Sequence, residues 1–408
     1  MNYNEALEKL KEYGQEHVLK YFEELSKEEQ AELLNQIEAT DFSIIKMCKN
    51  KEEAAKKGII SPLGAMQLSE IATKKDEYYN AGITAIKNGK VGAVLLAGGM
   101  GTRLGSDNPK GMYNIGETKD VFIFERIISN LLDVVKMSGA YIHLFIMTSD
   151  KNNDATINFF KEKNYFGYDK NFVTFFIQEM APATDYNGLV YMESKSKMST
   201  SPNGNGGWFE SMAKTGAFKV VKDNGIEWLN VFAVDNVLQR IADPVFVGAT
   251  INTGSQVGAK VVKKATRDEK VGVMCLEDGK PSIVEYYELT DELMDAVDEM
   301  GEPAYNYGVI LNYLLSVKHL EEIMEKQMPL HIVEKKIPYI DEAGNLIKPE
   351  QPNGYKFETL ILDMIHLLDT CLPFEVVRNK EFAPIKNKTG VDSVESARAL
   401  LKENGVTL

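Results

Sequence analysis

The sequence predicts an α/β protein with a Rossmann-like, mostly parallel mixed sheet and an N-terminal helical extension. From about residue 90 onward, short apolar runs alternate with stretches in which apolar residues show helical spacing. This alternation is typical of a mostly parallel sheet with helices on both faces. Each apolar run has the length of a strand. The strands are expected at 91–97, 141–148, 172–177, 228–234 and 257–263.

Helices are expected between these strands, at 120–138 and 151–163, and throughout the first part of the chain. Ser26 and Glu29 have the spacing of a capping box, which predicts that a helix begins there. No internal repeat or low-complexity linker divides the rest of the chain. We therefore expect an N-terminal helical region at 1–87 and one continuous main domain at 88–408.

The composition narrows the class of protein. A chain of 408 residues with a formal net charge of −14 is long enough for a sizeable core and is not expected to bind nucleic acid generally. The cysteines Cys48, Cys275 and Cys371 are widely spaced and show neither a metal nor a disulfide pattern, which favours a reducing cytoplasm. No targeting segment or membrane span is expected either.

A glycine-rich stretch follows the first predicted strand of the sheet. Gly98, Gly99 and Gly101 lack a Cβ where the backbone turns, so their N–H groups can approach a bound anion. Arg103 and Lys110 follow within a dozen residues and can bring positive charge to the same place. The order of strand, glycines and cations predicts a phosphate-binding loop. The alternative is a glycine-rich turn whose cations are merely solvated.

Two familiar phosphate-binding patterns are excluded here. A P-loop requires G-x-x-x-x-G-K-[ST], but Ser106 follows Gly105. The dinucleotide fingerprint G-x-G-x-x-G requires a third glycine at position 104, which is Leu104. The loop therefore belongs to neither class, and a dinucleotide-dependent oxidoreductase is disfavoured.

Asp235 is the candidate metal ligand. It follows the apolar run 228–234, so a carboxylate is expected where a buried strand reaches the ligand-binding edge of the sheet. Mg²⁺ is commonly bound by one or two carboxylates together with phosphate oxygens and water. An Asp-Asn turn that simply ends a strand is the alternative.

The string LAGGMGTRLG…PKGMY at 96–113 closely resembles the signature of the eukaryotic-type UDP-sugar pyrophosphorylases, a family of uridylyltransferases. Within this family the chain is most similar to the UDP-N-acetylglucosamine pyrophosphorylases, and the resemblance extends from about residue 19 to 398. It implies a nucleotide-diphospho-sugar transferase fold, with 88–408 as the catalytic domain. The C-terminal β domain of eukaryotic members is not expected in this chain, so their subunit contacts do not carry over and the oligomeric state stays open.

The resemblance also assigns roles to individual residues. Arg103, Lys110 and Lys386 would act on the phosphates as catalytic residues, and Lys356 would be a further phosphate contact. Asp235 would bind Mg²⁺ in the string VDN, and Gln178 would read the uracil edge. The remaining substrate-binding residues would be Gly98, Gly99 and Gly101 at the nucleotide, Gly204 and Asn205 in the loop SPNGNGG, and Gly272, Glu285 and Asn306 at the sugar.

The implied reaction joins UTP to a sugar-1-phosphate and gives a UDP-sugar and pyrophosphate. N-acetylglucosamine-1-phosphate is the expected sugar, by direct in-line attack on the α-phosphorus. The family motif Asn-Ala-Gly-Asn reads Asn306-Tyr307-Gly308-Val309 here, so glucose-1-phosphate or a broad range of sugar phosphates stays an alternative. A nucleotide-sugar binding protein without catalysis is the non-enzymatic alternative.

Overall fold

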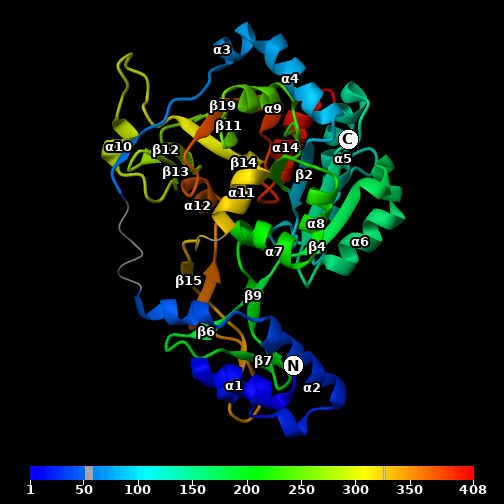
Figure 1. Cartoon of the computed structure of the whole chain (residues 1–408), viewed down its shortest axis with the longest axis vertical. Coiled ribbons are helices and arrows are strands. Elements are labelled where there is room, and N and C mark those ends of the chain that lie inside the picture. Colours follow the sequence, from blue (N-terminus) through cyan, green and yellow to red (C-terminus); the bar gives the residue numbers. More distant parts are fainter. Residues whose placement is uncertain (51–57, 325, 327) are drawn as a thin grey trace. The chain divides into compact units, whose positions relative to one another are not determined.

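The structure is a computed structural model that describes residues 1–50, 58–324, 326 and 328–408. The described residues fall into two compact units. Unit 1 comprises Met1–Lys56, Glu179–Gly207 and Met328–Ile361, and unit 2 comprises Lys57–Gln178, Trp208–Gln327 and Leu362–Leu408. Both units are thus built from separate stretches of sequence, and we describe each by itself (Figure 1).

Unit 2 contains a ten-stranded mixed sheet. Its central order is β1-β12-β14-β10-β2-β3-β4, with β11 between β14 and β19, and β13 on β12. Strands β10, β2, β3 and β4 run parallel, whereas β14 is antiparallel to both β10 and β11. The strands are β1 (Ile60–Pro62), β2 (Val91–Leu96), β3 (His143–Thr148), β4 (Val173–Ile177), β10 (Trp228–Ala233), β11 (Val257–Lys263), β12 (Val273–Glu277), β13 (Lys280–Val284), β14 (Tyr307–Ser316) and β19 (Cys371–Glu375).

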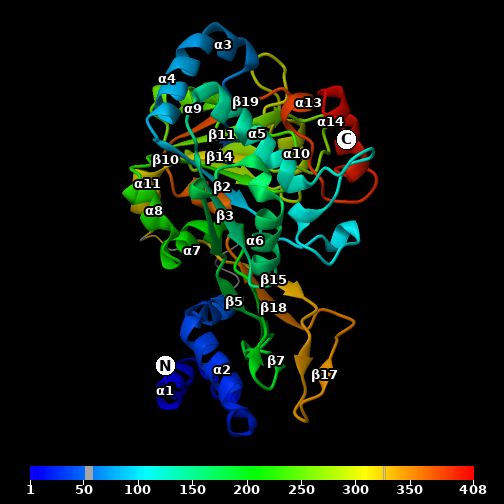
Figure 2. The same cartoon turned by 90° about the vertical axis from the view of Figure 1, so that its right-hand side faces the viewer.

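Helices cover both sides of the central strands, with α5 and α6 on one side and α7, α8 and α11 on the other (Figure 2). The helices of unit 2 are α3 (Leu68–Thr73), α4 (Lys75–Lys87), α5 (Ile123–Ser138), α6 (Asn153–Glu162), α7 (Trp208–Lys214), α8 (Ala217–Asp223), α9 (Pro244–Asn252), α10 (Asp291–Asp295), α11 (Val317–Met324), α13 (Arg378–Glu381) and α14 (Val394–Glu403), while α12 (Ile361–His366) begins at the last residue of unit 1. The predicted fold class is confirmed, as are the five predicted strands. No helix among the described residues is long and apolar enough to cross a membrane.

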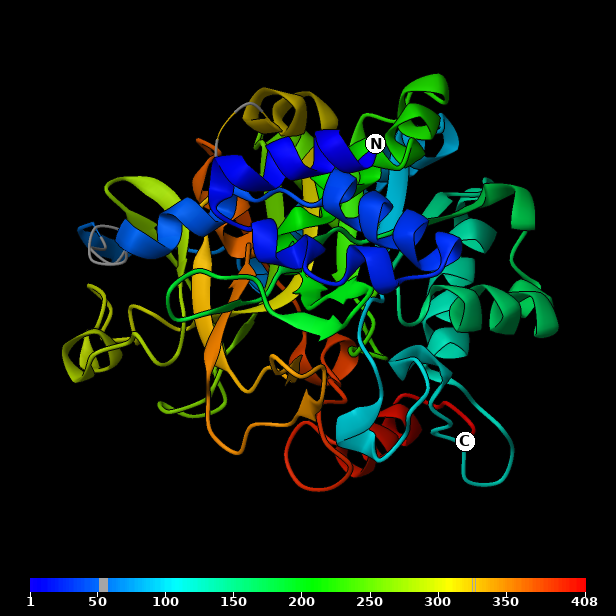
Figure 3. The ribbon, with the colours of Figure 1, turned by 90° about the horizontal axis from the view of Figure 1, so that it is seen from below.

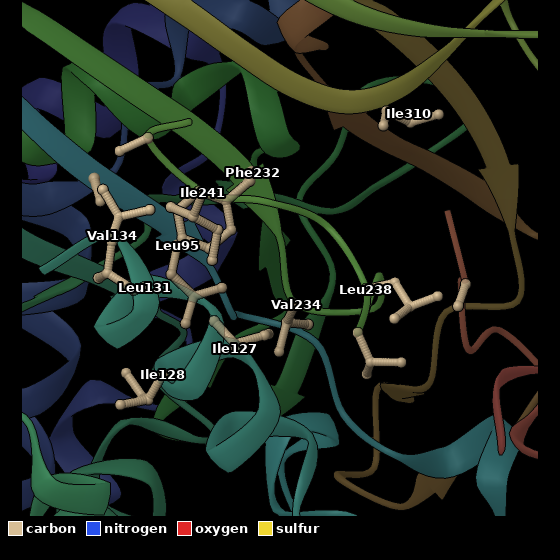
Figure 4. Packing of buried hydrophobic residues seen from close by; sticks show 14 of the residues in the cluster. Leu95, Ile127, Ile128, Leu131, Val134, Phe232, Val234, Leu238, Ile241 and Ile310 are labelled. Carbon is tan, nitrogen blue, oxygen red and sulfur yellow. The ribbon is translucent and has the colours of Figure 1, made fainter. Parts of the chain in front are cut away.

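Helix α5 shows why these residues form the layers of unit 2. Ile127 and Leu131 are completely buried on its inner face, and they lie with Leu95 of β2 and Phe232 of β10 (Figure 4). Strand β2 is buried along its whole length, as a continuous apolar run predicts for a parallel strand with helices on both faces. The parallel core therefore fixes the strand ends from which the loops of the site emerge.

Unit 1 combines the N-terminal helices with short strands. α1 (Tyr3–Tyr13) and α2 (Lys27–Ala39) lie beside each other (Figure 3) and contribute Leu10 and Leu33 to a core shared with Val190. The capping box at Ser26 is confirmed. The strands are β5 (Met180–Pro182), β6 (Thr184–Asp185), β7 (Met192–Ser194), β8 (Lys197–Met198), β9 (Thr200–Pro202), β15 (His331–Lys335), β16 (Tyr339–Ile340), β17 (Leu346–Ile347) and β18 (Gly354–Glu358).

The bounds of the two units differ from the expected boundary at residue 87. Residues 179–207 cluster with the N-terminal helices because their apolar side chains complete the same core. Helices α3 and α4, in contrast, belong to unit 2, where α4 packs on α9. The separate N-terminal region at 1–87 stays a prediction, because compactness alone does not define a functional domain.

The contact between α4 and α9 depends on two glycines. A Cβ on Gly248 would lie 1.8 Å from the backbone oxygen of Tyr78, and one on Gly82 would lie 1.9 Å from that of Pro244. These distances are far below any real contact with a Cβ, so the helix backbones approach as closely as they do only without side chains here.

We expect Gly248→Ala to lower the free energy of unfolding by about 3 kcal/mol, because the backbone of α4 must move to admit the methyl group. Urea denaturation followed by circular dichroism measures this change. Gly64→Ala is the control, since a Cβ at Gly64 meets nothing within 4 Å. Equal stability of the two variants would contradict the close helix contact.

Candidate active site

The candidate site lies at the carboxyl edge of the parallel strands in unit 2. Residues 97–105, the glycine-rich loop, follow β2, and Gln178 follows β4 directly. Asp235 comes two residues after the end of β10. Asn306 precedes β14, and because β14 is antiparallel to β10, its beginning lies at this same edge. Ligands bind at this edge in open α/β sheets, so the strand directions bring the predicted residues to the right side.

The glycines of this loop differ in what a Cβ atom would meet at each position. A Cβ on Gly98 would lie 2.8 Å from Oε1 of Gln178, and one on Gly101 would lie 3.1 Å from the backbone oxygen of Asn108. A Cβ on Gly99 would meet nothing within 4 Å. Protein atoms therefore explain the glycines at 98 and 101, whereas Gly99 faces open space, where a ligand can approach.

The loop folds back on itself as a small hairpin. The N–H of Gly101 donates to the oxygen of Asn108 at 2.8 Å, and the N–H of Lys110 donates to the oxygen of Gly99 at 3.1 Å. Gly105 makes the tight turn with a positive φ of 75°. This folding carries Lys110 back beside the glycines, although eleven positions separate it from Gly99.

The structure brings the predicted charged residues Arg103, Lys110, Lys386 and Asp235 together. Nζ of Lys110 lies 3.6 Å from Oδ2 of Asp235, and the two side chains are 17% and 24% exposed. Burial lowers the pKa of Lys110, and the charges of Arg103 and Lys386 lower it further, while Asp235 opposes the shift. A buried ammonium group between two other cations and one carboxylate is suited to bind a polyanion.

Backbone hydrogen bonds fix the distance between Asp235 and Lys386. The oxygen of Asp235 accepts from the N–H of Ile385 at 2.9 Å, and Asn236 pairs with Pro384 in an antiparallel bridge. The side chain of Asn236 is 2% exposed and bonds to the same segment, donating to the oxygen of Glu381 at 2.8 Å. The metal candidate and the cation therefore sit on neighbouring stretches of backbone.

A buried ion pair anchors the segment before Lys386. Nζ of the completely buried Lys260 lies 2.5 Å from Oε2 of Glu381. Burial raises the pKa of Glu381, and the charge of Lys260 opposes this shift. Removing either partner would leave a buried charge without its counterion, so the segment is held firmly at this point.

Lys386 itself has an acidic partner that sequence reasoning missed. Its Nζ donates to Oδ2 of Asp392 at 3.0 Å, and its backbone N–H donates to the oxygen of Asp392 at 2.7 Å. Asp392 has a positive φ of 52°, which is uncommon for a residue other than glycine. A carboxylate in the same short loop as the predicted cation was the only signal available in the sequence.

The predicted sugar-binding residues Gly272, Glu285 and Asn306 gather around the start of β14. A Cβ on Gly272 would lie 3.5 Å from Oε2 of Glu285, and the oxygen of Gly272 accepts from the N–H of Val309 at 2.9 Å. Oδ1 of Asn306 accepts from the N–H of Lys264 at 3.2 Å. The acceptor of Asn306 is thus used inside the protein.

The two positions that depart from the family motif lie on one face of β14, since side chains alternate along a strand. Tyr307 directs its hydroxyl group towards Gln67, and burial raises its pKa. Gly308 lies on the other face, and Asn306 precedes the strand. The departure at Tyr307 and Val309 therefore changes one face of β14 and leaves Asn306 itself in place.

The remaining predicted residues, Gly204, Asn205 and Lys356, lie in unit 1 and are described within it. Gly204 has a φ of 90°, and a Cβ there would lie 2.1 Å from the oxygen of Thr359. Oδ1 of Asn205 accepts from the N–H of Ile361 at 3.0 Å, so the acceptor expected for the sugar is used within unit 1. Lys356 lies in β18, where it pairs with Val333 of β15.

A metal ion at Asp235 would need further donors from a bound nucleotide and from water. Among the described residues, no group of three histidine, cysteine or carboxylate side chains could hold a metal. Asp235 is partly exposed and offers one hard oxygen donor. One carboxylate with phosphate oxygens and water is a set that Mg²⁺ accepts, so the residues fit an ion that arrives with a nucleotide.

The fold and these residues together define a nucleotide-binding transferase with a Rossmann-like sheet. A family model described as UTP–glucose-1-phosphate uridylyltransferase matches residues 44–408, and the chain belongs to this family. The predicted family resemblance is thereby confirmed.

Named relatives agree with this membership. The chain is 36% identical to the UDP-N-acetylglucosamine pyrophosphorylase of Saccharomyces cerevisiae, covering 95% of this chain and 87% of the relative. It is 34% identical to the UDP-N-acetylhexosamine pyrophosphorylase-like protein 1 of Mus musculus, over 97% and 83%. The solved structure of uridine diphosphate N-acetylglucosamine pyrophosphorylase from Trypanosoma brucei is similar with a TM-score of 0.83 at 27% identity, over 98% of this chain and 84% of that one.

The lowered pKa of Lys110 predicts the behaviour of Lys110→Met. At pH 7 the free energy of unfolding should stay constant or rise by up to ~1 kcal/mol, because a buried cation beside two others is removed. The unfolded chain holds this proton more tightly than the folded one. Wild-type stability should therefore rise with pH in the interval below 10.5, the ordinary value of lysine, and the variant should lack that rise.

Urea denaturation at pH 7 and above measures both effects. Lys170→Met, at an exposed position, is the control. A marked loss of stability in Lys110→Met at pH 7 would mean that the pair with Asp235 outweighs the burial of the ammonium group.

Proposed function

We propose that this protein transfers the uridylyl group of UTP to N-acetylglucosamine-1-phosphate, forming UDP-N-acetylglucosamine and pyrophosphate. The observation that carries the proposal is the grouping of Arg103, Lys110, Lys386 and Asp235 beside the glycine-rich loop. Membership of the uridylyltransferase family supports the reaction, and the activity named for its relatives supports the sugar.

The arrangement suits an in-line displacement at the α-phosphorus of UTP. A phosphate oxygen of the sugar-1-phosphate forms the new bond to phosphorus while the bond to the β-phosphate oxygen breaks. The attacking group is already anionic, so no protein base has to remove a proton. The residues contribute by positioning the reactants and by stabilising charge on the leaving pyrophosphate. Lys110 and Arg103 would stabilise this charge, with Lys386 on the adjacent segment.

Asp235 would bind Mg²⁺ in this proposal. The ion would neutralise phosphate charge when bound, and Asp235 is the side chain that would hold it. Nζ of Lys110 lies 3.6 Å from Oδ2 of Asp235, so the carboxylate has a positive neighbour within the protein. The same ammonium group can turn to a phosphate oxygen when a nucleotide is present.

Base and sugar recognition rest on other residues. Gln178 is 6% exposed and lies against Gly98, and its carboxamide suits an imide base that offers a donor and acceptors. The family resemblance assigns Gly204 to the uracil, Asn205 to the sugar and Lys356 to a phosphate. Gly272, Glu285 and Asn306 would line the sugar.

A cytoplasmic location is part of the proposal and rests on the wide spacing of Cys48, Cys275 and Cys371.

A second candidate is the same transfer to glucose-1-phosphate. The family is described by that sugar, and Tyr307 and Val309 depart from the motif of the N-acetylglucosamine enzymes. The match of Asn306 to the motif favours N-acetylglucosamine, since the departure leaves the proposed sugar-facing residue in place.

Pyrophosphate release tests the reaction and its sugar. UTP is combined with N-acetylglucosamine-1-phosphate, glucose-1-phosphate or galactose-1-phosphate, with and without Mg²⁺. We expect kcat/KM to be at least ~10-fold higher with N-acetylglucosamine-1-phosphate, and turnover to require Mg²⁺. Binding of UDP-sugar without turnover on any substrate would instead indicate a binding protein.

Asp235→Asn tests the proposed metal ligand. The substitution keeps the shape and removes the charge, so we expect turnover to fall by ~100-fold or more while the free energy of unfolding stays near that of the wild type. Asp150→Asn is the matched control, because Asp150 also follows a parallel strand at this edge and is exposed. Near-normal turnover of Asp235→Asn would contradict its role.

A further inference from the structure

Two polar side chains on the loop after β3 bind successive carbonyl groups of the glycine-rich loop. Nδ2 of Asn152 donates to the oxygen of Ala97 at 2.9 Å and to that of Gly99 at 3.4 Å. Oγ of Ser149 donates to the oxygen of Gly98, which lies between them, at 2.9 Å. The carbonyl groups of Ala97 and Gly98 therefore point towards this loop, and the oxygen of Gly99 is shared between Nδ2 of Asn152 and the N–H of Lys110, which donates at 3.1 Å.

The opposite side of these peptide groups consists of N–H donors. In a trans peptide the C=O and the next N–H point in opposite directions, and none of the described peptide bonds is cis. Holding the three carbonyls inward therefore turns the N–H groups of Gly98, Gly99 and Met100 outward. Within the part of the chain that the structure describes, none of these three N–H groups has a protein acceptor. Gly99 is exposed, so the row of donors is open to a ligand.

Asn152 is itself held in one orientation. Its side chain is completely buried, and its Oδ1 accepts from the N–H of Ser149 at 2.7 Å. This bond identifies Oδ1 and leaves Nδ2 facing the glycine-rich loop. Asn152 also begins α6, since its backbone oxygen accepts from the N–H of Thr156 at 2.9 Å. The carboxamide is therefore a rigid link between α6 and the loop.

We propose that Asn152, assisted by Ser149, is a positioning residue that holds the glycine-rich loop with three N–H groups turned to the phosphates of the substrate. The inference deepens the proposed function and rests on it for the identity of the anion. It also explains how a loop of glycines keeps one conformation. Glycine peptide groups rotate easily, and a rotated group would present a carbonyl oxygen that repels phosphate.

Two variants separate this role from a general contribution to stability. Asn152→Leu has a similar size and removes both hydrogen-bonding atoms. Asn152→Asp keeps the acceptor for Ser149 but places an oxygen opposite the carbonyls of Ala97 and Gly99. A carboxylate only accepts hydrogen bonds, so the peptide N–H groups should turn towards it and the carbonyls should face the ligand.

The control is a buried carboxamide of the same kind elsewhere in the chain. Gln15 is 2% exposed, donates to the oxygens of Gly188 and Tyr13, and accepts from the N–H of Val190. Gln15→Leu thus removes three hydrogen bonds of a buried carboxamide, as Asn152→Leu does, but in unit 1, whereas the glycine-rich loop belongs to unit 2.

Isothermal titration calorimetry with pyrophosphate alone, and with uridine alone, is the main test. We expect both Asn152 variants to raise the Kd of pyrophosphate by ~10-fold or more, as the loss of a charge-assisted hydrogen bond predicts, and to leave the Kd of uridine within ~2-fold. The KM of UTP should rise in parallel. Gln15→Leu should lose stability in urea to a similar degree and keep wild-type affinity for pyrophosphate.

Unchanged pyrophosphate affinity in the folded Asn152 variants would overturn the proposal, and so would an equal loss in Gln15→Leu. Failure of the proposed function is distinguishable, because it shows as absence of turnover in the wild type with every sugar phosphate. The pyrophosphate titration does not depend on turnover, so it tests the loop independently.

Discussion

The antiparallel contact between residues 235–237 and 383–385 is the constraint on which the site depends. It joins the loop after β10 to a segment more than a hundred residues later, and it is made of backbone bonds and one buried asparagine. Surface ion pairs are weakened by salt and rearrange when a ligand arrives, whereas these hydrogen bonds keep their geometry. The spacing of Asp235 and Lys386 is therefore set by the fold. The ammonium group of Lys110, in contrast, can bind either the carboxylate of Asp235 or a phosphate group.

The charges gathered at the site are opposite in sign to the net charge of the chain. The chain carries a net charge of −14, yet three cations meet at one strand edge, and one of them is largely buried. Strands β2 and β10 carry no charged side chain that could compensate these charges. The site is stabilised instead by carboxylates, Asp235 and Asp392, each beside one lysine. A polyanion that displaces these pairs would enter a site already formed for it.

The sequence allowed the fold class to be predicted because parallel strands buried on both faces are continuous apolar runs, as at 91–96 and 228–233. Strand β14 was harder, since its alternating and polar residues include the buried Asn312. The glycine-rich loop, Lys110 and Asp235 were predicted and lie together. Asn152, Asn236 and Asp392 were missed because each acts through backbone groups whose position only the folded chain defines. The glycines at 98 and 101 lie in the predicted loop, but packing against protein atoms accounts for them, and their contact with a nucleotide stays a prediction.

The discontinuity of unit 1 has a consequence for how the chain reaches its folded form. The core around Leu10 and Leu33 includes Val190 and Met198, and the strand β18 that pairs with β6 ends only at Glu358. During synthesis the N-terminal helices emerge long before the residues that cover their apolar faces. Contacts of such high sequence separation form slowly, and the uncovered faces are prone to association in the meantime. The core of unit 1 can therefore be completed only after nearly all of the chain has been synthesised.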